Sequence, residues 1–172
     1  KVNDALKRVE SLIEQYPDDA LLHNVSGACY ASLDEIDKAI SSYNIALTIN
    51  PNYAEANNNL GITLHRKGDI DEAIRNYKNA LLVKPKYAEA QNNLGNAFKD
   101  LGKLDLAIEL YEKAIVIKPD FPEAFDNLVV VLKEFDQLEV AINSYQKVII
   151  VNPKLAQAHH NLGLVLQLSG QN

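Results

Sequence analysis

The stretch "AEANNNLGITLHRKGDIDEAIRNYKNALLVKP", residues 54–85, decides the fold. In its first half, apolar residues recur at four-residue steps, which places them on one face of a helix. Gly68 interrupts this pattern, and a second helical stripe follows before Pro85 prevents continuation. The stretch therefore predicts two helices, over 54–67 and 70–83, joined by a tight turn.

Three consecutive asparagines, Asn57, Asn58 and Asn59, stand inside the first of these helices. Asparagine is a middling to poor helix former because its side chain competes for the hydrogen bonds of the backbone. The apolar spacing nevertheless continues through the run, so we interpret it as helix rather than loop. The amides then need a role that outweighs their effect on helix stability.

The same pattern of helix-ending and packing residues recurs along all 172 residues. Prolines stand at 34-residue steps, at Pro17, Pro51, Pro85, Pro119 and Pro153. Four further rows keep this step: Ala39, Ala73, Ala107 and Ala141; Tyr43, Tyr77, Tyr111 and Tyr145; Leu60, Leu94, Leu128 and Leu162; and Gly27, Gly61, Gly95 and Gly163. A fixed period over the whole chain predicts stacked repeats rather than one closed core.

Each period contains two helical patterns, and no run of residues alternates with the two-residue period of a strand. We therefore predict an all-α fold built from antiparallel helix pairs. Counting registers gives a single array over 1–172 with four full repeats and a half repeat at each end. The predicted segments are 1–19 (second helix only), 20–53, 54–87, 88–121, 122–155 and 156–172 (first helix only).

These rows resemble the tetratricopeptide repeat (TPR) family. The family signature is a Leu-Gly pair in the first helix, followed by Ala, an aromatic residue and Ala in the second helix, and then Pro. The matching residues are Leu60, Gly61, Ala73, Tyr77, Ala80 and Pro85 in one repeat, and Leu94, Gly95, Ala107, Tyr111, Ala114 and Pro119 in the next. The resemblance covers the whole chain and implies an α-α superhelix, which is a solenoid of helix pairs.

Two positions depart from the family pattern. The aromatic residue that is usual near the start of the first helix is present only as Phe125, and the other copies have His23, Asn57, Gln91 and His159. Val129 stands where the other copies have glycine, at the closest approach of the paired helices. We therefore expect a wider helix spacing in repeat 122–155 than in its neighbours.

Helical geometry places most of the asparagine run away from the apolar stripe. At 100° per residue, positions 55, 58, 59, 62, 65 and 66 lie on the opposite side of the helix. The family resemblance implies that the first helices line a concave groove, so that these positions face a ligand. Matching offsets in the other repeats give the candidate peptide-binding residues: Asn58, Asn59, Asn92, Asn93, Asn96, Asn127, Asn161, Glu55, Glu89, Glu123, His65, Arg66, Lys99 and Lys133.

An asparagine amide offers donors and an acceptor without net charge, which suits a peptide backbone of any sequence. The middle row of the predicted groove consists of Asn59, Asn93, Asn127 and Asn161. Helix spacing and the rise of an extended chain give a footprint of roughly ten peptide residues. The repeats resemble those of O-linked N-acetylglucosamine transferase and related bacterial TPR proteins. That likeness implies a ladder of amides that holds an extended polypeptide.

The alternative interpretation is that these asparagines are solvated surface residues copied by repeat duplication. Replacing Asn93 and Asn127 by alanine would separate the two interpretations. Alanine favours a helix by about 0.5 kcal/mol per site, so the sequence predicts equal or slightly higher stability, with weaker peptide binding if the ladder is real.

Several other functions are disfavoured by the sequence. The net charge of −6 gives no general attraction for phosphate backbones, so we expect no nucleic-acid partner. The longest apolar runs are too short to cross a membrane. The adjacent His159 and His160 point about 100° apart on a helix and cannot share a metal, and Cys29 is interpreted as a small packing residue. With no phosphate loop or nucleophile elbow in the sequence, we expect no catalysis, cofactor or metal.

The sequence therefore predicts a scaffold that binds a protein or an extended peptide. Two alternatives stay open: a substrate-recruiting segment of a larger glycosyltransferase or sulfotransferase, and a homotypic assembly module. The chain starts with Lys and contains no Met, so we interpret it as part of a longer protein and expect either more repeats or self-association at its open helical ends. A cytoplasmic location is expected.

Overall fold

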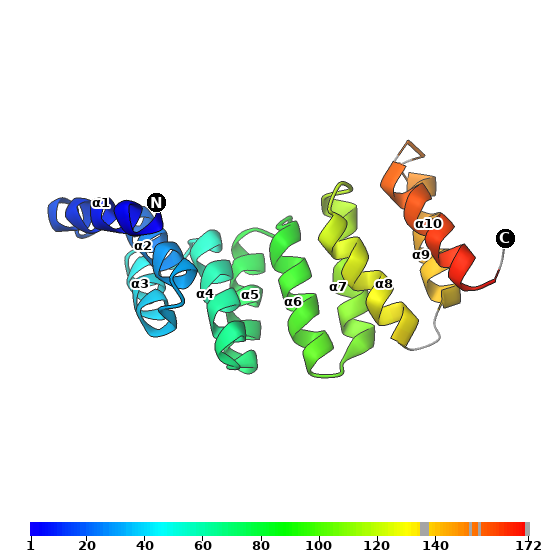
Figure 1. Cartoon of the computed structure of the whole chain (residues 1–172), viewed down its shortest axis with the longest axis horizontal. Coiled ribbons are helices and arrows are strands. Elements are labelled where there is room, and N and C mark those ends of the chain that lie inside the picture. The colour runs from blue at the N-terminus through cyan, green and yellow to red at the C-terminus, as the bar shows by residue number, and fades with distance from the viewer. Residues whose placement is uncertain (135–137, 152, 155, 171–172) are drawn as a thin grey trace. The chain divides into compact units, whose positions relative to one another are not determined.

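A computed structural model describes residues 1–134, 138–151, 153–154 and 156–170 (Figure 1). Within these residues the chain forms helices without any strand. The helices are α1 (Val2–Gln15), α2 (Ala20–Ser32), α3 (Ile36–Ile49), α4 (Ala54–Lys67), α5 (Ile70–Val83), α6 (Ala88–Asp100), α7 (Leu104–Ile117), α8 (Pro122–Glu134), α9 (Leu138–Val151) and α10 (Ala156–Leu168). The predicted all-α class is confirmed.

The chain forms two compact units. Unit 1 is Lys1–Pro85 and contains α1 to α5, and unit 2 is Lys86–Asn172 and contains α6 to α10. Inside each unit, consecutive helices pack against one another, and the pairs α2–α3, α4–α5 and α6–α7 make the most extensive contacts. The consecutive packing of helix pairs within the units matches the architecture that the 34-residue period predicts. The repeat boundaries themselves stay a prediction.

Backbone conformation explains where the helices end. Gly68 closes α4 with φ 95°, and Gly102 has φ 70° at the matching position of the next repeat. In the first full repeat this position is Asp34, which adopts φ 63° in spite of its side chain. Asparagine and aspartate tolerate this left-handed region better than other non-glycine residues do.

A tyrosine of the second helix packs against the backbone of the first helix in three pairs. A Cβ atom added at Gly61 would lie 2.6 Å from Cε1 of Tyr77, and the same distance holds at Gly27 with Tyr43 and at Gly95 with Tyr111. All three rings are buried, and burial raises the pKa of the Tyr43 hydroxyl to about 12. Glycine at these three positions is therefore required by ring packing, since any side chain there would meet the ring.

The pair α8–α9 is packed differently. Val129 occupies the glycine position and is half-buried, and the tyrosine of this pair, Tyr145, is buried. Its ring stacks on that of Phe125, with centroids 5.7 Å apart and planes 21° from parallel. The expected widening of this pair stays a prediction.

Candidate functional site

In unit 1, asparagines of neighbouring first helices are hydrogen-bonded to each other. Asn59 on α4 donates from Nδ2 to Oδ1 of Asn24 on α2 over 3.1 Å. Asn24 in turn donates from Nδ2 to the hydroxyl oxygen of Tyr53 over 3.4 Å. Asn24 and Asn58 are buried, whereas Asn59 is half-buried. The amides therefore join α2 to α4.

The same bond recurs in unit 2. Asn127 on α8 donates from Nδ2 to Oδ1 of Asn92 on α6 over 3.0 Å, again at a sequence separation of 35 residues. Asn96 accepts a hydrogen bond of 2.8 Å from the hydroxyl of Tyr111. The rest of the predicted amide row in this unit is half-buried at Asn93 and buried at Asn161.

These contacts divide the predicted amides by exposure. Asn58, Asn92 and Asn161 are at most 6% exposed, so they are not solvated surface residues and offer little surface to a ligand. Asn59 and Asn127 are half-buried and are held by the buried amides behind them. The sequence did not reveal this pairing, because a bond across 35 residues depends on how neighbouring repeats pack. The only sign of this pairing in the sequence is that asparagines recur at 34-residue steps in two adjacent positions.

The hydrogen bonds also correct the stability expected of the alanine variants. Replacing Asn127 removes its bond to Asn92, and an intramolecular hydrogen bond contributes about 1 kcal/mol net. This loss exceeds the gain of about 0.5 kcal/mol in helix propensity. The variant is thus expected to be slightly less stable rather than equal or more stable.

The acidic edge of the predicted groove is paired with lysines. Glu55 accepts a hydrogen bond of 3.0 Å from Lys84, and Glu89 accepts one of 2.8 Å from Lys118. The hydrogen bond from Lys84 holds the pKa of Glu55 below its usual value. The sequence did not predict these two lysines as partners of the glutamates, although each lysine follows its glutamate by 29 residues. Glu123 is exposed.

On the basic edge of the predicted groove, Arg66 is bound to the end of helix α2. Arg66 donates from Nη1 to the carbonyl oxygen of Ala31 over 3.0 Å and from Nη2 to Asp34 over 2.9 Å. It therefore binds the last turn of α2, where the helix dipole favours a cation. His65 and Lys99 are half-buried, and the Lys133 side chain lies outside the described residues.

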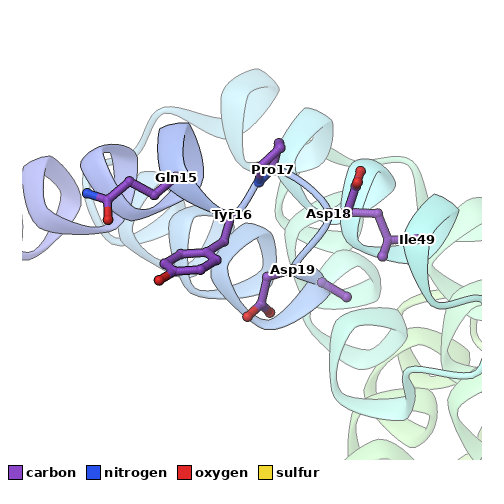
Figure 2. Close-up of a pocket in the computed structure, with 7 residues that line it drawn as sticks. Gln15, Tyr16, Pro17, Asp18, Asp19 and Ile49 are labelled. Carbon is purple, nitrogen blue, oxygen red and sulfur yellow. The ribbon is translucent and has the colours of Figure 1, made fainter.

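A shallow pocket of about 580 Å³ lies in unit 1 where α1 meets α2 (Figure 2). It is lined by residues 15–20 and by Ile49 at the end of α3. The carboxylate of Asp19 accepts bonds of 2.8 and 3.4 Å from the backbone nitrogens of Leu21 and Leu22, so it caps α2. None of the predicted groove residues lines this pocket.

In the described part of the chain, no group of three or more His, Cys, Asp or Glu side chains could hold a metal ion. Among the described helices, none has both the length and the apolar character needed to span a bilayer.

Comparisons with known proteins agree with this architecture. Solved structures similar to the chain include that of MamA, at 24% identity and TM-score 0.75, with 91% of each chain covered. They also include YrrB, described as a TPR protein with an unusual peptide-binding site, at 21% identity and TM-score 0.70, with 95% of this chain and 84% of that chain covered. At these identities the likeness shows the fold. A comparison with curated protein sequences gives no match.

Family models match the sequence directly. The model described as "Tetratricopeptide repeat" matches residues 52–120, and the model described as "TPR repeat" matches residues 27–68 and 135–170. Together they span most of the chain, and they agree with the helix pairs and the glycine–tyrosine packing described above. The chain therefore belongs to the tetratricopeptide repeat family.

Proposed function

We propose that this chain is a scaffold that binds an extended polypeptide along its first helices, and that the half-buried asparagines make the contact. TPR proteins in general mediate interactions between proteins. The observation that carries the proposal is the repeated amide–amide bond, from Asn59 to Asn24 in unit 1 and from Asn127 to Asn92 in unit 2.

The bond fixes how the half-buried amide is oriented. An asparagine side chain has two donor hydrogens and an acceptor oxygen, and the bond to the buried partner uses one donor. The second donor and the oxygen of Asn59 or Asn127 are then available to a ligand in a fixed direction. A preorganised amide loses less conformational entropy on binding than a freely rotating one. A peptide backbone presents the complementary carbonyl and N–H groups at every residue.

The surroundings of this row favour a neutral backbone over a charged ligand. Glu55 and Glu89 on the acidic edge are each paired with a lysine, and Arg66 is bound to Asp34. These charges are therefore balanced within the units. We extend the proposal to the other members of the predicted row, Asn93 and Asn161. The resemblance of the repeats to those of O-linked N-acetylglucosamine transferase, whose amide ladder holds a polypeptide, supports it.

A peptide array of varied sequences, probed with the whole chain, tests the proposal. We expect binding to many extended peptides. The double variant Asn59→Ala with Asn127→Ala should weaken binding about thirtyfold, since each lost hydrogen bond contributes about 1 kcal/mol net. Asn143→Ala is the matched control, because Asn143 is an exposed asparagine on the second helix α9.

Two results would contradict the proposal. One is equal affinity of the double variant and the wild-type chain for peptides selected on the array. The other is binding to a single tight motif whose affinity responds equally to Asn143→Ala. Circular dichroism of each variant establishes that the helices are intact before affinities are compared.

A further inference from the structure

Helix α2 in unit 1 has an exposed apolar face at the positions that match the predicted groove. Leu21, Val25 and Ala28 follow one another at steps of four and three residues, so they lie on one face of the helix. Leu21 is 56% exposed, Ala28 is exposed and Val25 is half-buried, so this face is open to a ligand. The whole of α2 contains no Asp, Glu, Lys or Arg. Single exposed apolar residues are common on proteins, whereas a contiguous group of them is a mark of an interaction surface.

This face is next to the amide bond that joins α2 to α4. At 100° per residue, Asn24 is turned about 60° from Leu21, and Oδ1 of Asn24 accepts the hydrogen bond from Asn59 over 3.1 Å. On α4, Ile62 is turned by the same angle from Asn59 and is 36% exposed. The apolar face of α2 therefore adjoins the proposed backbone-binding amide, and Ile62 adds an apolar side chain on the α4 side.

The matching positions of the next two helix pairs carry charges instead. Glu55 and Glu89 stand one and two periods after Leu21. Each accepts a hydrogen bond from a lysine at the end of the second helix, over 3.0 and 2.8 Å. In the pair α2–α3 the residue one period before Lys84 is Asn50. Both members of the ion pair are thus replaced in this pair, and an apolar side chain is exposed in place of a carboxylate.

We propose that the apolar face of α2, which consists of Leu21, Val25 and Ala28, binds an aliphatic side chain of the extended polypeptide whose backbone is held by Asn59. This site rests on the proposed function of the amide row, to which it adds a preference for sequence. The amides contact only the backbone, so they do not by themselves select one peptide over another. The occupant is a polypeptide segment with leucine, isoleucine or valine beside a neutral stretch of chain.

Two observations identify this occupant. The bond from Asn59 to Asn24 makes the apolar face continuous with the amide row, so one extended chain can contact both. Neighbouring helices lie roughly 10 Å apart and an extended chain rises about 3.3 Å per residue, so the aliphatic side chain is expected about three residues from the one that Asn59 holds. A charged side chain is disfavoured, because α2 offers it no counter-ion and the carboxylate of Asp19 already caps the helix.

Fluorescence anisotropy of labelled peptides, titrated with the whole chain, tests this site. The peptides are about ten residues long, which is the expected footprint of the groove. They consist of serine and threonine except for one central residue, which is leucine, alanine or lysine. The leucine peptide should bind about tenfold more tightly than the alanine peptide, because its longer side chain removes more apolar surface from water even where an open face covers only about half of it. The lysine peptide should bind no better than the alanine peptide.

Variants of the chain locate the contact. Leu21→Glu with Asn50→Lys gives α2–α3 the ion pair of the next two pairs, so the fold already accepts these residues and the net charge is unchanged. This variant should lower the affinity for the leucine peptide to that for the alanine peptide. Leu82→Glu with Asn79→Lys makes the same replacements at exposed positions of α5 and should alter neither affinity. Asn59→Ala should weaken both peptides by the same factor.

The outcomes separate the apolar face from the amide row. Equal binding of the leucine and alanine peptides, both weakened by Asn59→Ala, would overturn the aliphatic site and leave the proposed function intact. A leucine preference that Leu21→Glu with Asn50→Lys removes, without any effect of Asn59→Ala, would retain the site and overturn the role of the amide. A leucine preference that persists in the Leu21→Glu variant would overturn the site, and binding of no peptide would overturn both proposals. Self-association of the free chain that the Leu21→Glu variant abolishes would assign the face to a second copy instead.

Discussion

The helix pairs α4–α5 and α8–α9 share one architecture but fill their interiors differently. The first has Asn57 and Gly61 where the second has Phe125 and Val129. In the first, the Tyr77 ring occupies the space above the glycine, and Asn57 lines a pocket of about 410 Å³. In the second, the Phe125 ring is buried against the ring of Tyr145. The comparison teaches that small residues and rings together decide how the interior of a helix pair is filled, not any one row.

The largest effect is expected from Phe125→Asn, which gives the second repeat the residue of the first. The change removes a fully buried, stacked ring, and replacing such a ring by a small residue costs about 3–5 kcal/mol. Chemical denaturation followed by circular dichroism measures the loss. A loss below about 1 kcal/mol would mean that the ring contributes little and that the two repeats are packed alike.

A smaller but clear loss is expected from Gly61→Val, which gives the first repeat the residue of the second. The added Cβ would stand 2.6 Å from Cε1 of Tyr77, whose ring is 1% exposed and has little room to move. Overpacking of this kind costs about 1–3 kcal/mol. The same denaturation experiment checks it, with Gly68→Ala as a contrast: that site has open space but φ 95°, so strain alone acts there.

The amide bond is a feature that the two repeats share, so equal effects are expected from Asn59→Ala and Asn127→Ala. Each change removes the donor to a buried partner amide but gains helix propensity, so it should lower stability by about 0.5 kcal/mol. A double-mutant cycle of Asn92→Ala with Asn127→Ala should give a coupling energy of similar size. Additive effects in that cycle would show that the bond contributes nothing.

The smallest expected effect is on the pH dependence of stability, which should differ between variants of Glu55 and of Glu123. Hydrogen bonding from Lys84 lowers the folded-state pKa of Glu55, so its stabilising contribution is present above the unfolded-state pKa and is lost as the pH falls through the folded-state value. Both side chains of this pair are about half exposed, which limits the contribution to a few tenths of a kcal/mol.

Thermal unfolding between about pH 3 and 6 measures this contribution, in a range that brackets the ordinary glutamate pKa. Glu55→Gln should reduce the stability gained on raising the pH through this range. Glu123→Gln is the comparison, because the sequence has Asn152 rather than lysine 29 residues later. Equal pH profiles of the two variants would show that Lys84 has no effect.

The helices could be predicted because their limits depend on local chemistry. Pro85 and Gly68 end helices by their own backbone preferences, and the apolar spacing defines which face is packed. The partners of the predicted site residues could not be predicted in this way. Arg66 reaches Ala31 and Asp34 in the preceding repeat, and such a contact depends on the packing of side chains between repeats.

The recurrence of the amide bond at 35 residues has a consequence for how such arrays grow or shrink. The bond joins one position of the 34-residue period to the preceding position one period earlier, from Asn59 to Asn24 and from Asn127 to Asn92. Excision of residues 54–87 would place Asn93 in the register of Asn59, opposite Asn24. We therefore expect an array to tolerate the loss or gain of a whole 34-residue module at this bond, whereas the loss of a single residue would put Asn24 out of register with its partner.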